Sequence, residues 1–70
     1  MKMTIYKSKE NLDMGFSIQE SRGEVSLWID ECEGGEAYQD DWTYEDHFDS
    51  KEDAYQYIVE NYGEVELLDI

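Results

Sequence analysis

Proline, cysteine, histidine and basic residues are absent or scarce in this chain of 70 residues, and each scarcity excludes something. No proline occurs, and no shift in composition indicates a linker or an internal repeat. Cys32 is the single cysteine, so an internal disulfide and a multi-cysteine zinc site are both excluded. Lysine and arginine together number five, which argues against direct binding of nucleic acid because phosphate contacts require these residues.

Long apolar runs are also missing. Residues 1–7 lack the apolar segment of a signal peptide, and no stretch approaches the length of a membrane span. A lone thiol is typical of a reducing compartment, so we expect a cytoplasmic protein without a membrane partner. We expect a single domain over residues 1–70, whose small hydrophobic core contributes a net stability of about 3–5 kcal/mol.

Acidic residues dominate what is present, and they are unevenly placed. The chain has 19 acids against five bases, a net charge of −14. Residues 1–29 hold four acids and four bases, whereas residues 30–70 hold fifteen acids and one base, Lys51. Eleven of those acids lie between Asp30 and Asp53. Such asymmetry favours a charged partner over general solubility.

Alternation of apolar and polar residues predicts strands around residues 3–6, 14–19 and 25–30. These patterns, together with two tryptophans, six tyrosines and two phenylalanines, indicate a folded chain rather than a disordered acidic one. Each predicted strand has one apolar face, as expected for an antiparallel sheet that is buried on one side.

Turn signals set the predicted strand pairing. Gly34-Gly35 supplies the positive φ that a tight hairpin requires, Arg22-Gly23 marks a second turn, and residues 9–12 form a third connection. Counting outward from these turns gives apolar pairs on one shared face: Leu27 with Trp42, Val25 with Tyr44, Ile18 with Leu27, Phe16 with Ile29, and Ile5 with Phe16. The sequence therefore predicts a four-stranded antiparallel meander.

A helix is predicted after the meander. Ser50 and Asp53 have the spacing of an N-terminal cap, and Gly63 is a natural C-terminal stop. The apolar stripe that should lie on the buried sheet face consists of Ala54, Tyr55, Ile58, Val59 and Tyr62. Residues 65–70 predict a fifth strand without indicating its neighbour. The expected class is α+β, with element order ββββαβ and the helix packed on one sheet face.

The predicted turns bring the acids into an array that binds a basic protein surface. Alternate side chains of a strand point the same way about 6.5–7 Å apart, and phosphates along one DNA strand advance about 3.4 Å each. Carboxylates so arranged imitate a phosphate backbone in sign and spacing, at the cost of mutual repulsion. The predicted partner-binding acids are Asp30, Glu31, Glu33, Glu36, Asp40, Asp41, Glu45, Asp46, Asp49, Glu52 and Asp53. The alternative is an acidic face that only keeps the protein soluble.

Trp28 is the other residue predicted to bind the partner. The derived pairing places it on the face opposite the core, near Tyr6, Ser26, Asp30, Cys32, Asp41 and Thr43. Tryptophan is enriched among interface hot spots, so Trp28 would anchor a contact with an acidic rim. The alternative is that the helix or the last strand covers this face.

Enzymatic chemistry is not expected. Cys32 and His47 are the sole candidate nucleophile and base, and no third group is evident to orient them. Carboxylates on an open surface lack the burial that separates the pKa values of a catalytic acid and base. The acidic, glycine-containing segment 30–36 lacks the ligand pattern of an EF-hand. We therefore expect no catalytic residue, metal site or cofactor.

In size, charge and predicted sheet-and-helix build, the whole chain resembles the small acidic inhibitors made by phages and mobile elements, the anti-CRISPR proteins and anti-restriction DNA mimics. The resemblance implies host defence evasion by occupation of a positively charged groove in a CRISPR effector or similar nuclease. Two alternatives stay open: an immunity or antitoxin-type protein that neutralises a basic toxin, and an acidic regulatory module that binds protein. An exposed edge strand would allow either a monomer or a homodimer.

Overall fold

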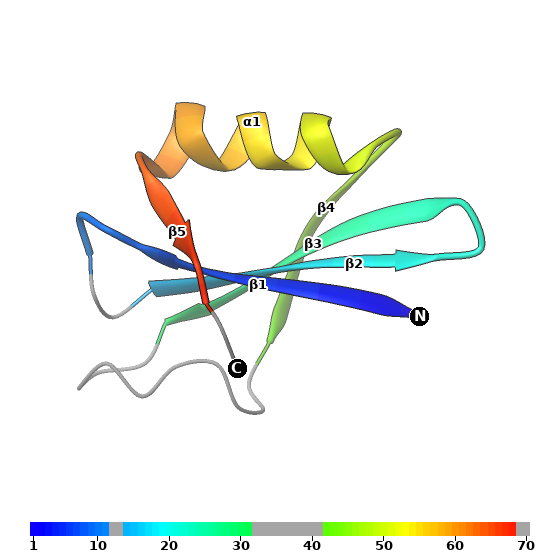
Figure 1. Cartoon of the computed structure of the whole chain (residues 1–70), viewed down its shortest axis with the longest axis horizontal. Coiled ribbons are helices and arrows are strands. Elements are labelled where there is room, and N and C mark those ends of the chain that lie inside the picture. Colours follow the sequence, from blue (N-terminus) through cyan, green and yellow to red (C-terminus); the bar gives the residue numbers. More distant parts are fainter. Residues whose placement is uncertain (12–13, 32–41, 69–70) are drawn as a thin grey trace.

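The structure is a computed structural model that describes residues 1–11, 14–31 and 42–68. Five strands and one helix follow one another along the chain (Figure 1). Their bounds are β1 Lys2–Ser8, β2 Met14–Ser21, β3 Glu24–Glu31, β4 Thr43–Phe48, α1 Lys51–Tyr62 and β5 Val65–Leu67.

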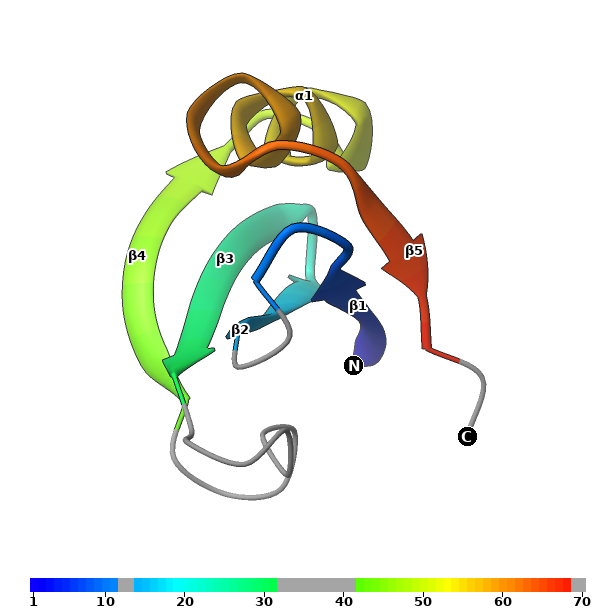
Figure 2. The ribbon, with the colours of Figure 1, turned by 90° about the vertical axis from the view of Figure 1, so that its left-hand side faces the viewer.

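The strands form one sheet in the order β4-β3-β2-β1-β5, and every neighbouring pair is antiparallel. Figure 2 shows β4 and β5 at opposite edges of the twisted sheet, with α1 lying across one face. The predicted α+β class and ββββαβ order are confirmed. The neighbour of β5, which the sequence leaves open, is β1.

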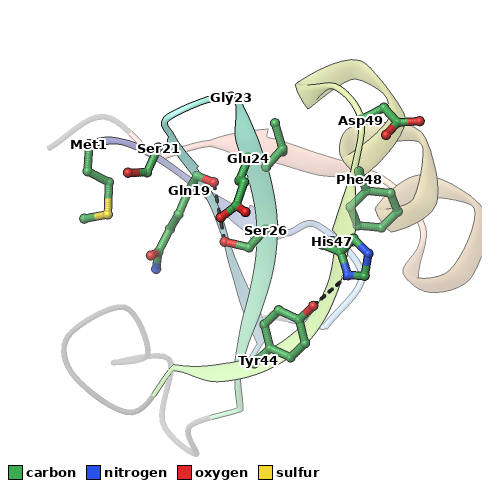
Figure 3. A pocket seen from close by; sticks show the side chains of 11 residues that line it. Met1, Gln19, Ser21, Gly23, Glu24, Ser26, Tyr44, His47, Phe48 and Asp49 are labelled. Atoms are coloured by element: carbon green, nitrogen blue, oxygen red, sulfur yellow. Dashed lines mark hydrogen bonds between the residues drawn. The ribbon is translucent and has the colours of Figure 1, made fainter.

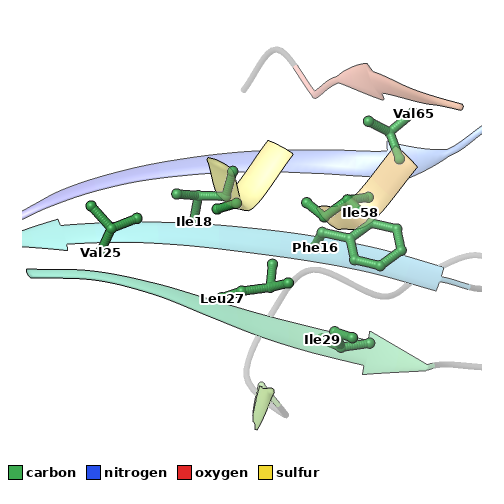
Figure 4. Packing of buried hydrophobic residues seen from close by; sticks show 8 residues of the cluster. Phe16, Ile18, Val25, Leu27, Ile29, Ile58 and Val65 are labelled. Atoms are coloured by element: carbon green, nitrogen blue, oxygen red, sulfur yellow. The ribbon is translucent and has the colours of Figure 1, made fainter. Parts of the chain in front are cut away.

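The core lies between α1 and the alternate side chains of β2 and β3. Phe16 pairs with Ile29 and Ile18 pairs with Leu27, as predicted. Figure 4 shows these side chains gathered around Ile58 of the helix, and the cluster is completed by Val25, Ala54 and Val65. The intervening Arg22-Gly23 turn has φ values of 53° and 80°, the two positive values of a type I′ hairpin turn.

The pairing of β1 with β2 differs from the prediction by one residue. Tyr6, rather than Ile5, lies opposite Phe16, and its ring contacts that of Tyr55 on the helix at 5.5 Å. Ile5 lies opposite Ser17 instead, where it is 9% exposed on the face away from the helix. A shift of one residue moves every side chain of a strand to the other face.

The cause of this shift is the connection that leaves β1. The Ser8 side-chain oxygen accepts hydrogen bonds from the backbone N–H groups of Glu10, at 3.2 Å, and Asn11, at 2.9 Å. The Met14 N–H then donates to the Asn11 carbonyl at 3.0 Å. This local turn makes the connection one residue longer than the four-residue loop predicted.

The pairing of β4 with β3 also differs from the prediction. Val25 lies opposite Phe48 and Leu27 opposite Asp46, in place of Tyr44 and Trp42. Phe48 packs against the core, which provides the apolar partner that Tyr44 was expected to supply. The register shifts between Leu27 and Trp28 and leaves Glu45 as an extra residue, so β4 contains a β-bulge. The predicted Gly34-Gly35 turn lies outside the described residues.

The ends of α1 are the predicted ones, but its buried face is rotated about the helix axis relative to the predicted apolar stripe. The Ser50 Oγ accepts a hydrogen bond from the Asp53 N–H at 3.1 Å, and Gly63 ends the helix with φ 94°. Ala54 and Ile58 are buried, whereas Tyr55 and Val59 of the predicted stripe are 40% and 36% exposed.

Aromatic packing explains this rotation of the helix. Tyr57, which the predicted stripe omits, contacts Phe48 with ring centroids 5.2 Å apart. Tyr62 contacts Phe16 at the same centroid separation, 5.2 Å. The helix therefore directs Tyr57 toward β4 and Tyr62 toward β2. Within residues 1–11, 14–31 and 42–68, no helix has the length and hydropathy needed to cross a membrane.

Truncation of Leu27 to alanine should unfold a large fraction of the protein. Leu27 is 0% exposed, and burying such a side chain is worth about 2–5 kcal/mol, comparable to the whole net stability expected at this size. Leu67→Ala is the matched control, because Leu67 is 62% exposed and should cost less than about 0.5 kcal/mol. Urea unfolding, followed by tryptophan fluorescence, measures the free energy of unfolding of both variants. Equal losses for the two variants would contradict the described core.

Candidate functional site

The predicted partner-binding acids fall into three groups. Glu33, Glu36, Asp40 and Asp41 lie outside the described residues. Asp30 and Glu45 are drawn toward the interior, and the remaining five acids are exposed: Glu31, Asp46, Asp49, Glu52 and Asp53.

Asp30 and Glu45 occupy positions unlike the surface array that the sequence predicts. Asp30 is 5% exposed, opposite Gly15 on the sheet face away from the helix. Glu45, the bulged residue of β4, faces the helix and accepts hydrogen bonds from the hydroxyl groups of Tyr57, at 2.7 Å, and Tyr62, at 2.9 Å. A carboxylate bonded in this way joins the edge strand to the helix, which is an internal structural role.

Four of the exposed acids follow one another along the chain from the edge strand β4 into the first turn of α1. Asp46 lies on the edge strand β4, Asp49 lies just beyond the end of that strand, and Glu52 and Asp53 lie in the first turn of α1. We call these four residues the acidic edge. Figure 1 shows β4 leading directly into α1, so the four residues belong to one continuous stretch of chain.

Negative charge is not confined to the acidic edge. Glu60, Glu64 and Glu66 are exposed on the end of α1 and on the segment that leads through β5. The Glu66 carboxylate pairs with the Lys7 ammonium at 3.0 Å. Near the β2–β3 turn, bases and acids share the walls of one surface hollow, which include Lys2, Glu20, Arg22, Glu24, Asp49, Lys51 and Glu52.

Trp28 lies on the sheet face opposite the helix, as predicted, and is half-buried there. Its ring makes an edge contact with that of Tyr44, with centroids 5.4 Å apart, and its Nε1–H donates to Ser26 Oγ at 3.0 Å. Of its predicted neighbours, Ser26 and Asp30 share this face, while Tyr6 and Thr43 lie on the helix side. Cys32 and Asp41 lie outside the described residues.

Of the sole candidate nucleophile and base, Cys32 lies outside the described residues. His47 is on β4 with a side chain that is 80% exposed. Its Nδ1 atom lies 3.0 Å from the Tyr44 hydroxyl oxygen and 3.7 Å from Asp46 Oδ1. No group of three metal-ligating side chains occurs in the described part of the chain.

Sequence reasoning missed the Glu45 cluster. Tyr57 and Tyr62 are five residues apart, so they do not share the simple three- or four-residue spacing of a helical stripe. Burial, followed by the hydrogen bond to Glu45, raises the pKa of Tyr62 to about 12. The hydrogen bond to Glu45, followed by burial, raises the pKa of Tyr57. The sequence does contain one signal for this cluster, which is an acid in the middle of an edge strand followed by a helix that contains tyrosines.

Stability should therefore fall steeply in alkali. An unfolded tyrosine releases its proton near pH 10, whereas Tyr62 holds it to about pH 12 in the folded protein. Between these values the unfolded state binds fewer protons than the native state, so the free energy of unfolding decreases as pH rises. Tyr62→Phe should be less stable than the parent at neutral pH, by about 1 kcal/mol, and should show a shallower alkaline decline.

Urea unfolding over a series of pH values measures this difference. Tyr55→Phe is the control, because Tyr55 is on the same helix and is 40% exposed. The control should follow the parent profile. Identical alkaline slopes for the parent and Tyr62→Phe would contradict the described contact with Glu45.

Comparison with known proteins gives no match. No protein-family model matches the chain, and neither a curated protein nor a solved structure does. Function has to be inferred from the charge, exposure and contacts of this chain alone.

Proposed function

We propose that this protein is a non-enzymatic inhibitor that binds the basic nucleic-acid-binding surface of a nuclease or CRISPR effector and blocks nucleic-acid binding. The observation that carries the proposal is the acidic edge. Residues 42–53 contain five acids and a single base, Lys51, and four of these acids are exposed along β4 and the start of α1.

The position of Asp46 on an edge strand supports the proposal that the partner is a protein. β4 is the last strand of the sheet among the described residues, so its outer side is open to a second molecule. The Asp46 side chain is 51% exposed at this edge. Two copies of the chain that paired through β4 would bring their Asp46 and Asp49 carboxylates together, and like charges across strands destabilise pairing. The acidic edge therefore favours a basic partner over a second copy.

The net charge supports rapid association with such a partner. A charge of −14 destabilises a compact domain of 70 residues through self-repulsion. Complementary fields raise association rates to about 10⁸–10⁹ M⁻¹s⁻¹ at low salt, compared with about 10⁵–10⁶ M⁻¹s⁻¹ for neutral surfaces. A protein that must reach its target before nucleic acid does would gain directly from this steering.

Reversal of the acidic edge should weaken binding more than reversal elsewhere. Asp46→Lys with Asp49→Lys changes the net charge from −14 to −10, and Glu10→Lys with Glu64→Lys changes it by the same amount at the other end of the sheet. Partners are first captured on the immobilised protein at low salt from lysate of the cell in which it acts. The edge variant should then associate about tenfold more slowly with the purified partner, and the control variant less than about threefold.

High salt should weaken capture, and the captured protein should lose nucleic-acid binding when the chain is added. Equal losses for the two variants would contradict the role of the acidic edge. A captured toxin that does not bind nucleic acid would favour the immunity-protein alternative. Binding that resists high salt would favour an acidic regulatory module.

A further inference from the structure

A hollow of about 550 Å³ lies on the sheet face opposite the helix, between β2, β3 and the edge strand β4 (Figure 3). Gln19, Ser26 and His47 are opposite one another across these three strands, and Ser21 pairs with Glu24 in the next row. The small residues Ser21, Gly23 and Ser26 leave space where larger side chains would fill the face. We call this feature the outer hollow.

Aromatic side chains form the β4 wall of the outer hollow. Tyr44 is held from two sides, because its ring contacts Trp28 edge-on at 5.4 Å and its hydroxyl lies 3.0 Å from His47 Nδ1. Tyr44 is nevertheless 49% exposed, so part of its ring is open to a ligand. In Figure 3 the rings of Tyr44 and His47 border the hollow on the side of β4.

The opposite wall is polar and negatively charged. Figure 3 shows Gln19, Glu24 and Ser26 on the side of β2 and β3. Met1 and, beyond the end of β4, Asp49 also line the hollow, whereas no lysine or arginine does so among the described residues. Among the described residues, Glu24 takes part neither in the Lys7–Glu66 salt bridge nor in the contact between Asp46 and His47. The lining therefore combines acceptor oxygens and a carboxylate with an exposed aromatic ring.

We propose that the outer hollow binds the guanidinium group of an arginine side chain. This inference rests on the proposed function, because the arginine would belong to the basic surface of the inhibited partner. The guanidinium would stack on the Tyr44 ring and donate hydrogen bonds to the Glu24 carboxylate and to Ser26 Oγ.

Arginine fits this lining better than lysine does. A guanidinium is planar, stacks on aromatic faces and presents five donors in a fixed fork, whereas an ammonium is a compact and strongly hydrated point charge. The volume of the outer hollow falls in the range of about 300–1,000 Å³ that is typical of small-ligand sites. A polar wall that faces an aromatic wall suits a flat cation with donors at its rim.

The test titrates the full chain, labelled with ¹⁵N, with N-acetyl-arginine methylamide and follows its amide resonances. The matched probe is N-acetyl-citrulline methylamide, which has nearly the same shape without the charge. Arginine should give saturable shifts at Ser26, Tyr44 and His47 with a dissociation constant in roughly the millimolar range, and citrulline should not. Glu24→Gln should weaken arginine binding about fivefold, and Tyr44→Leu should abolish saturation.

Glu64→Gln is the control variant, because it removes one exposed carboxylate far from the outer hollow and should leave the titration unchanged. Equal responses to arginine and citrulline, or arginine shifts spread over all the acidic residues, would overturn the proposal. So would an unchanged titration in Glu24→Gln. This titration does not involve nucleic acid, so it tests the arginine site separately from the proposed inhibition. The protein can block nucleic-acid binding while the outer hollow fails to bind arginine. Conversely, the outer hollow can bind arginine while the protein fails to block nucleic-acid binding.

Discussion

Burial of alternate side chains of β2 and β3 beneath α1 is the constraint on which the other placements depend. Phe16, Ile18 and Leu27 are fully buried, and each belongs to a strand whose side chains alternate between faces. Once these residues face the helix, Ser26 and Trp28 must face the other way. The outer hollow is therefore a direct consequence of how the core is packed, and β4 becomes an open edge because the sheet ends there among the described residues.

The sequence predicted the parts of the fold that local rules determine. The pairing of Phe16 with Ile29 followed from the Arg22-Gly23 turn, and the helix followed from its cap at Ser50. The β1 and β4 registers were wrong because they depend on features that alternation cannot reveal. One is the Ser8-centred turn that lengthens a loop, and the other is the bulge at Glu45. The site was predicted less well, since burial of Asp30 depends on tertiary packing rather than on its place in the pattern.

The acids of this chain thus occupy two kinds of position. Glu45 is bonded to two tyrosines and holds the edge strand against the helix, so it belongs to the scaffold. Asp46 on the same strand and Asp49 just beyond its end are both exposed, so they are accessible to a partner. The bulge separates the two kinds of residue, because Glu45 is the extra residue bonded to the helix, while the Asp46 side chain is 51% exposed. The proposed inhibitor would use the outward-facing acids for steering and the outer hollow for a specific contact.

In the proposed mode of inhibition, this protein and nucleic acid compete for one basic surface. Fluorescence anisotropy of a labelled nucleic acid bound to the captured partner tests it most directly, at several concentrations of the unlabelled protein. We predict that the apparent dissociation constant for the nucleic acid rises linearly with the protein concentration and that no ternary complex forms. A complex that contains protein, partner and nucleic acid together, with an unchanged dissociation constant, would contradict the account.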